Sequence, residues 1–182
     1  QAWHGLVSMA RFSAPALSPD GAWLAFLHCF NPTGRNPAAV GQLFVCRVDN
    51  STLRQLSPGT AHRFPRFLPD GRHYTFASVP GSDGKTDTWI GELGSPKRTL
   101  AIRANTGAIF AAPGYMLFVR DQSLVAQPFS LARSRAEGEP VRIGDAPSNQ
   151  NMLGSPAASA SLPPGTLVYE VVAQLTELGI GQ

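Results

Sequence analysis

The residue types that could act as nucleophiles or bind a metal ion are few in this chain of 182 residues. Its two cysteines and four histidines lack the CxxC or HxxxH spacing that structural zinc sites use. Ser155 lacks the Gly-x-Ser-x-Gly context of a nucleophile elbow, and the sequence contains no phosphate-binding loop and no kinase signature. We therefore expect no catalytic residue, no metal site and no cofactor, and we interpret the protein as one that is not an enzyme.

Two short features leave weaker alternatives for a bound cation or a covalent link. In the segment Gly81–Asp87 two aspartates flank Gly84, but they do not meet the spacing of a calcium-binding loop. We interpret this segment as a solvated hairpin tip. Cys29 and Cys46 fall on strands that we expect to be neighbours, and we interpret them as two small buried side chains. A disulfide between them is the alternative, which their spacing cannot decide.

Four arginines are the candidate residues for binding a ligand or partner: Arg35, Arg63, Arg66 and Arg72. Two longer loops, residues 29–41 and 80–87, interrupt the repeat, and Arg35 lies in the first of them. Function tends to be carried by loops that a rigid scaffold holds in place. We therefore expect the four arginines to contact a ligand at one rim of the fold.

The distribution of charge and hydropathy excludes two classes of partner. The net charge is +3, and the nearest approach to a basic run is Lys97-Arg98. Nucleic-acid binding requires a clustered basic face, so we expect no nucleic-acid partner. No stretch approaches the about 18 consecutive apolar residues of a transmembrane helix, so we expect no membrane span in this sequence.

The elements that must position these residues are indicated by a turn that recurs four times. Each turn contains a proline followed closely by a glycine, and the glycines are Gly21, Gly71, Gly114 and Gly165, at steps of 50, 43 and 51 residues. Proline suits the second position of a tight turn, and glycine adopts the positive φ that hairpins require. Apolar residues alternate after each glycine, so every turn predicts a hairpin of two strands.

A second pair of strands follows each of the first three hairpins. We predict these pairs at 42–49 with 53–57, at 87–93 with 97–102, and at 123–130 with 140–144. Four strands in each 40–50 residues are typical of a β-propeller blade. The sequence therefore predicts one all-β domain, residues 1–182, forming an arc of about four blades of four-stranded antiparallel sheet. The blades are expected at about 12–58, 62–103 and 105–146, with a partial fourth blade at 157–182.

The repeated segments also resemble a known group of proteins. "PALSPDGAWLAF" and "PRFLPDGRHYTF" resemble the WD40-like repeats of TolB-type propellers, called PD40 repeats after their Pro-Asp. The segment 112–146 is similar to a blade in the C-terminal propellers of some bacterial serine/threonine kinases. It has the expected "GYMLFVR", "LVAQPF" and "GEPV". The resemblance implies a bacterial protein, in a periplasmic or extracellular location rather than a cytoplasmic one.

Such propellers usually have six or more blades, so the resemblance implies that this chain is an open arc, a fragment or part of an assembly. We expect a non-catalytic interaction or sensor module that binds a protein, peptide or small ligand at the blade rim or in the central funnel. One alternative is the propeller part of a prolyl-oligopeptidase-like serine peptidase. Another is a structural module that forms a homo-oligomer through exposed edge strands and so completes the ring.

Overall fold

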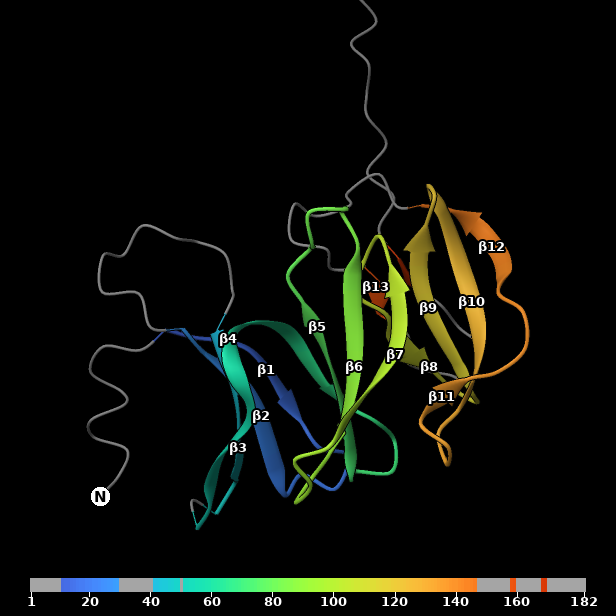
Figure 1. Ribbon diagram of the computed structural model, residues 1–182. Helices are drawn as coiled ribbons and strands as arrows, with labels where there is room; N and C mark the ends of the chain where they lie inside the picture. The colour runs from blue at the N-terminus through green and yellow to red at the C-terminus, as the bar shows by residue number, and fades with distance from the viewer. Residues whose placement is uncertain (1–10, 30–40, 50, 147–157, 160–167, 170–182) are drawn as a thin grey trace, which may run out of the picture.

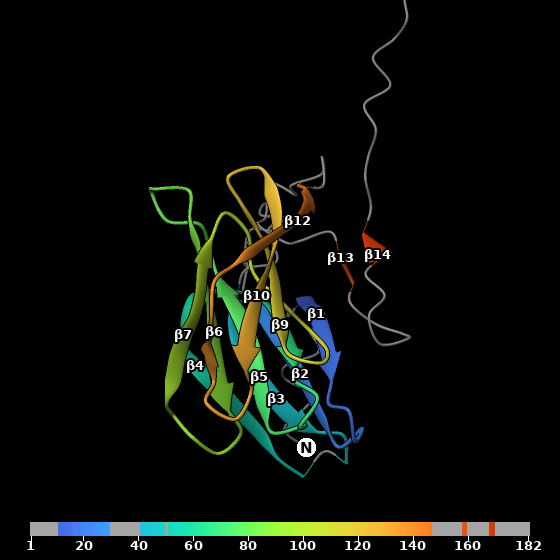
Figure 2. The same ribbon diagram turned by 90° about the vertical axis from the view of Figure 1, so that its right-hand side faces the viewer.

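The computed structural model describes residues 11–29, 41–49, 51–146, 158–159 and 168–169, and every regular element in these residues is a β-strand. Apart from three strands of two residues each, the strands fall into three successive units, which lie side by side in Figure 1. In the perpendicular view the units overlap, as sheets stacked one behind another do (Figure 2). The prediction of an all-β fold with antiparallel sheets is confirmed. A search of the described residues for a helix able to cross a membrane finds none.

The strands of each unit follow one another along the chain. The first unit contains β1 (Arg11–Leu17), β2 (Trp23–Cys29), β3 (Gly41–Arg47) and the first part of β4 (Leu53–Phe67). The second contains the rest of β4, β5 (His73–Ser78), β6 (Thr86–Glu92) and β7 (Arg98–Ala104). The third contains β8 (Ile109–Ala111), β9 (Tyr115–Arg120), β10 (Ser123–Ser130) and β12 (Val141–Asp145), with the short β11 (Arg135–Ala136) at the end of β10. β13 (Ala158–Ser159) pairs with β14 (Val168–Tyr169).

Strand β4 joins the first two units, which the sequence predicts as separate sheets. Its first part pairs with β3, and its second part pairs with β5. The change of partner occurs at His62, which lies opposite both Gly41 and Ser78. Pro58 and Gly59 favour a break at this point, but the backbone remains extended through them. The seven strands β1–β7 are therefore hydrogen-bonded in one continuous order.

The two Pro-Asp-Gly corners adopt the geometry expected from their sequence. The Gly21 N–H donates to the Ser18 carbonyl at 2.9 Å, and the Gly71 N–H donates to the Leu68 carbonyl at 3.0 Å. Both glycines have positive φ, 71° and 66°. This arrangement is a tight turn followed by a left-handed residue, which returns the chain into an antiparallel strand.

The aspartate of each corner accepts hydrogen bonds from the backbone that follows it. Asp70 Oδ1 accepts from the N–H groups of Arg72 and His73 at 3.0 and 2.9 Å, and Asp70 Oδ2 lies 2.6 Å from His73 Nδ1. Partial burial opposes the charge of Asp70, but these hydrogen bonds hold the pKa of its carboxyl below the ordinary value. The third corner differs, because Ala112-Pro113 is a cis peptide bond and Gly114 does not have positive φ.

Apolar side chains fill the spaces between successive units, as the alternating strands predict. Leu27 and Leu43 of the first unit form one buried cluster with Tyr74 and Phe76 of the second. A larger cluster joins the second unit to the third through Leu68, Ile90, Ile102, Ala104, Ala108, Met116, Phe118, Val125 and Phe129. Stacked sheets bury their faces against one another in this way, and the core of the molecule lies between the units.

A disulfide, the alternative considered for the two cysteines, is not formed. Cys46 is a buried free thiol, and burial raises its pKa. The strands β2 and β3 are neighbours, as expected, but Cys46 lies opposite Leu24. Leu24 and Cys29 are five positions apart in β2, a distance along an extended strand that no disulfide spans.

Candidate functional site

A cavity of about 860 Å³ lies among the first strands of the three units. Its lining consists of Pro15, Ala16, Leu17 and Pro19 from the first unit, Phe64 to Pro69 and Thr75 from the second, and Ile109, Phe110 and Ala112 from the third. The first strand of each unit is therefore its innermost strand, and the three converge on one space. We call this cavity, defined by these residues, the central channel.

Two equivalent bulges shape the inner strands where they meet the central channel. The pairing of β1 with β2 shifts between Ser13 and Ala16, and that of β4 with β5 shifts between Arg63 and Arg66. These positions are related by the 50-residue step of the repeat. A proline lies inside each bulge, Pro15 or Pro65, and cannot donate to the strand ladder. A bulge bends its strand and redirects the side chains beside it.

The second bulge also contains a strained residue. Phe64 has a φ of 51°, which a bulky side chain rarely adopts, and its side chain lines the central channel. Strain of this kind persists only where the surrounding structure holds it, and such positions concentrate at ligand-binding sites.

Arg66 is the one ionisable side chain among the described residues that line the central channel. It follows the bulge and lies opposite Thr75, and it is partly buried. Burial lowers the pKa of its guanidinium, and no hydrogen bond or ion pair with a described residue offsets that burial. The described wall of the channel is thus mostly apolar and carries a single cationic group.

Of the other three predicted arginines, the structure describes Arg63 and Arg72, and neither lines the channel. Arg63 is 7% exposed, lies opposite Ala77, and has a guanidinium pKa lowered by burial. Arg72 is exposed at the second corner and forms an ion pair with Glu92. Arg35 lies outside the described residues.

Sequence reasoning missed the apolar part of this site, although one signal for it is present. A proline stands four residues before the proline of each Pro-Asp-Gly corner, at Pro15 before Pro19 and at Pro65 before Pro69. Proline inside a predicted strand indicates a bulge or an unpaired edge. Its recurrence at one repeat position marks the place where two inner strands open toward a common space.

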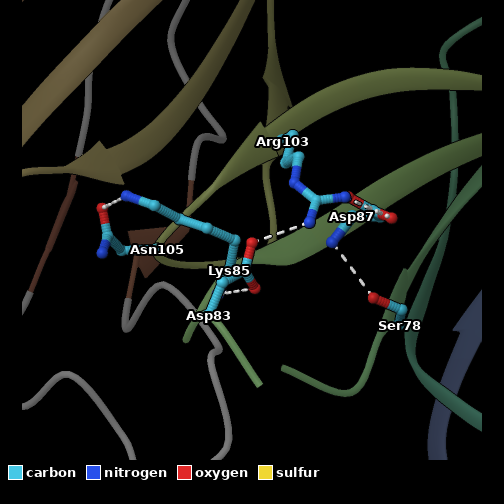
Figure 3. A network of polar contacts seen from close by, with 6 residues as sticks. All are labelled: Ser78, Asp83, Lys85, Asp87, Arg103 and Asn105. Carbon is cyan, nitrogen blue, oxygen red and sulfur yellow. Dashed lines mark hydrogen bonds and ion pairs between the residues drawn. The ribbon is translucent and has the colours of Figure 1, made fainter. Parts of the chain in front are cut away.

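The segment Gly81–Asp87 forms an ion-paired hairpin tip (Figure 3). Arg103 Nη2 lies 2.7 Å from Asp83 Oδ2, and Arg103 Nη1 lies 3.1 Å from Asp87 Oδ1. The hydrogen bond from Arg103 holds the pKa of the Asp83 carboxyl below its ordinary value. The carboxylates that faintly suggested a calcium loop are thus engaged by an arginine. No group of three potential metal ligands occurs in the part of the chain that the structure describes.

Beside this tip, a polar contact fastens the second unit to the third. Lys85 Nζ lies 3.2 Å from Asn105 Oδ1 (Figure 3), and the backbone N–H of Asn105 donates to the Val119 carbonyl at 3.0 Å. The Asp121 N–H donates to the same Asn105 oxygen at 3.0 Å. These bonds hold adjacent units in place, so we assign the network a structural role.

Comparison with solved structures decides what this arrangement of units is. The β-propeller domain of the Trilobed protease from Pyrococcus furiosus, described as having an open velcro topology, matches with a TM-score of 0.57 at 14% identity. The match covers 75% of this chain and 43% of that one. The fold is that of a β-propeller. The three units are blades, and the described part of the chain forms a partial propeller.

Two further solved structures share this propeller fold at low sequence identity. An oligogalacturonate lyase in complex with manganese matches with a TM-score of 0.56 at 15% identity, over 82% of this chain and 42% of that one. An acylaminoacyl peptidase from Pyrococcus horikoshii matches with a TM-score of 0.54 at 10% identity, over 76% of this chain and 26% of that one. The chain therefore spans less than half the length of each protein. No family model matches the sequence, and no curated protein matches it.

Proposed function

We propose that this propeller is a non-catalytic interaction or sensor module that binds a protein segment or small ligand in its central channel. The observation that carries the proposal is the cavity itself, because the inner strands of three blades line it. Its volume of about 860 Å³ falls in the range of ligand pockets, roughly 300–1,000 Å³. Its described lining has no carboxylate, imidazole or thiol, the groups on which general acid–base and nucleophilic catalysis most often rely.

We further propose that the repeats are of the TolB-like, PD40 type. The support is local: both Pro-Asp-Gly corners form the same turn, with the aspartate bonded to the backbone after it. In that setting the chain acts as a sensor-type binding module of a bacterial envelope protein. The binding site is then in the central channel rather than at the rim that the four arginines suggested.

The test is to fill the channel and measure binding of a neutral apolar dye. Nile red fluorescence should show saturable binding of one molecule per chain. Ala16→Trp places a large side chain in the channel and should weaken this binding by about tenfold or more, whereas Val48→Trp, at an exposed turn after β3, should not. Absence of saturable binding, or equal binding to both variants, would overturn the proposal.

The propeller part of a serine peptidase is a second candidate, because two proteins with the matching fold are peptidases. In this reading the channel controls access of substrate to a hydrolase domain. The gene that encodes this chain should then also encode a hydrolase region with a Gly-x-Ser-x-Gly segment. The whole gene product should cleave a chromogenic peptide such as acetyl-alanine p-nitroanilide, and Ala16→Trp should lower the rate. A product without hydrolytic activity would eliminate this candidate.

A further inference from the structure

We infer that the central channel selects organic carboxylates, in which one carboxylate is attached to an apolar body, and that Arg66 binds the carboxylate. This inference rests on the proposed function, because it assigns a ligand class to the same channel.

The first argument is the electrostatic state of Arg66. A guanidinium remains protonated in proteins, so the partial burial of Arg66 leaves a charge that has lost part of its hydration. Among the described residues no carboxylate or carbonyl replaces that hydration. A partly desolvated cation without a counter-ion is less stable than one in water, and a ligand anion that enters the channel supplies the missing counter-charge. Carboxylates fit this role because guanidinium can donate two parallel hydrogen bonds to one carboxylate.

The second argument is that the propeller repeat does not require an arginine here. Ala16 occupies the equivalent position of the first blade, 50 residues earlier, and the same bulge forms beside it. Both side chains line the channel. A small apolar residue therefore satisfies the fold at this position, and the charge of Arg66 is an addition that the architecture leaves unexplained.

The third argument concerns the rest of the ligand. Leu17, Phe64, Phe67, Leu68 and Phe110 contribute apolar wall around the single cation. Burial of apolar surface against such walls is favourable, whereas a second ligand charge would have no partner among the described lining residues. The lining thus fits a monoanion with an apolar body better than a phosphate ester or another polyanion. A free organic acid and the C-terminal carboxylate of a peptide that ends in an apolar residue share this chemistry.

The experiment measures displacement of Nile red by matched ligands. Octanoate and octan-1-ol have the same chain length and differ in charge. With the unmodified chain, octanoate should bind at least about tenfold more tightly than octan-1-ol, and acetate should bind far more weakly than octanoate. Arg66→Met should abolish the preference for octanoate while leaving octan-1-ol affinity within about twofold, and Arg66→Lys should retain part of it. Arg133→Met, which removes an exposed arginine paired with Glu137, is the matched control and should bind like the unmodified chain.

The outcomes separate this inference from the proposed function. Equal affinities for octanoate and octan-1-ol in the unmodified chain would overturn the inference and leave the channel proposal intact; this comparison needs no variant to fold. The inference would also be overturned if Arg133→Met lost the preference for octanoate over octan-1-ol. A second arm compares acetyl-Ala-Ala-Phe as free acid and as amide. If the peptide acid is preferred over its amide by a larger factor than octanoate is preferred over octan-1-ol, the ligand is assigned to peptide C-termini. If the factor for octanoate is larger, the ligand is assigned to small organic acids.

Discussion

Gly91→Ala should destabilise the protein, although alanine normally suits a strand better than glycine does. Gly91 lies in β6 directly opposite Tyr74 of β5, and its φ is not positive, so the backbone itself accepts alanine. A methyl group at Gly91 would, however, lie 2.4 Å from both Cζ and Oη of Tyr74. Ordinary van der Waals contact begins at 3.4 Å, so the ring would have to move by about 1 Å (3.4 − 2.4).

The Tyr74 ring has little room for this displacement. It is 2% exposed and packs in the cluster between the first and second blades, with its centroid 6.1 Å from that of Phe76. Forcing an extra methyl group into such a core costs about 1–3 kcal/mol. At about 2–4 °C per kcal/mol for a chain of this size, the melting temperature should fall measurably.

A double-mutant cycle, with urea denaturation as the assay, isolates this contact. Tyr74→Leu destabilises the chain by itself, but it vacates the space that the new methyl group requires. Gly91→Ala should therefore cost at least about 1 kcal/mol less in the Tyr74→Leu background than in the unmodified chain. Equal costs in both backgrounds would refute the register of β5 against β6 and the packing derived from it.

The remaining predictions concern single side chains and the edge of the third blade. Asp70→Ala should cost about 1 kcal/mol in urea denaturation near pH 7, because two backbone N–H groups lose their acceptor. The pKa of Asp70 is lowered by folding, so its contribution is complete above the ordinary pKa of about 3.9 and is lost as the pH falls further. The unmodified chain should then lose more stability below pH 4 than the variant does. Burial raises the pKa of Tyr74 to about 12. This tyrosine should ionise last in an ultraviolet titration. Its contribution to stability should be complete below about pH 10 and lost as the pH rises toward 12. A Tyr74→Phe variant that still shows the tyrosine ionisation at the highest pH would contradict this. Thr88→Val should lower the free energy of unfolding by about 1–3 kcal/mol, because the buried Thr88 hydroxyl accepts a hydrogen bond of 2.8 Å from the Ala108 N–H, which belongs to the next blade. A loss under about 0.5 kcal/mol would contradict this. If two chains pair through the backbone of the edge strand β12, then Val141→Lys, which puts a charge at a position that is 58% exposed, should lower the mass measured by light scattering. A monomer before substitution would exclude that pairing.

The local elements of this fold were predictable because short-range chemistry specifies them. Pro19 and Gly21 strongly favour a tight turn. The alternation of apolar and polar residues after each corner requires strands with one buried face. The long strand β4 was not predictable in the same way. Pro58 and Gly59 argue locally for a break, and only the pairing of β3 and β5 along its two halves keeps the backbone extended.

The candidate site depends on tertiary placement even more strongly. Four arginines looked equivalent in sequence, yet Arg66 faces the channel whereas Arg72 is exposed at the turn. Their difference arises from the bulge at Phe64 and Pro65, which sets the direction of the next side chain. The sequence shows the proline, but it does not show which strands surround the space that the bulge opens.

The central claim is that successive units stack face to face as blades around one channel, and nuclear Overhauser contacts between side chains test it most directly. Leu68, Ile90 and Ile102 of the second blade should show cross-peaks to Met116 and Phe118 of the third, because all five lie in one buried cluster. Cross-peaks confined to strands that are hydrogen-bonded neighbours, with none between these two sets, would contradict the stacking and with it the channel.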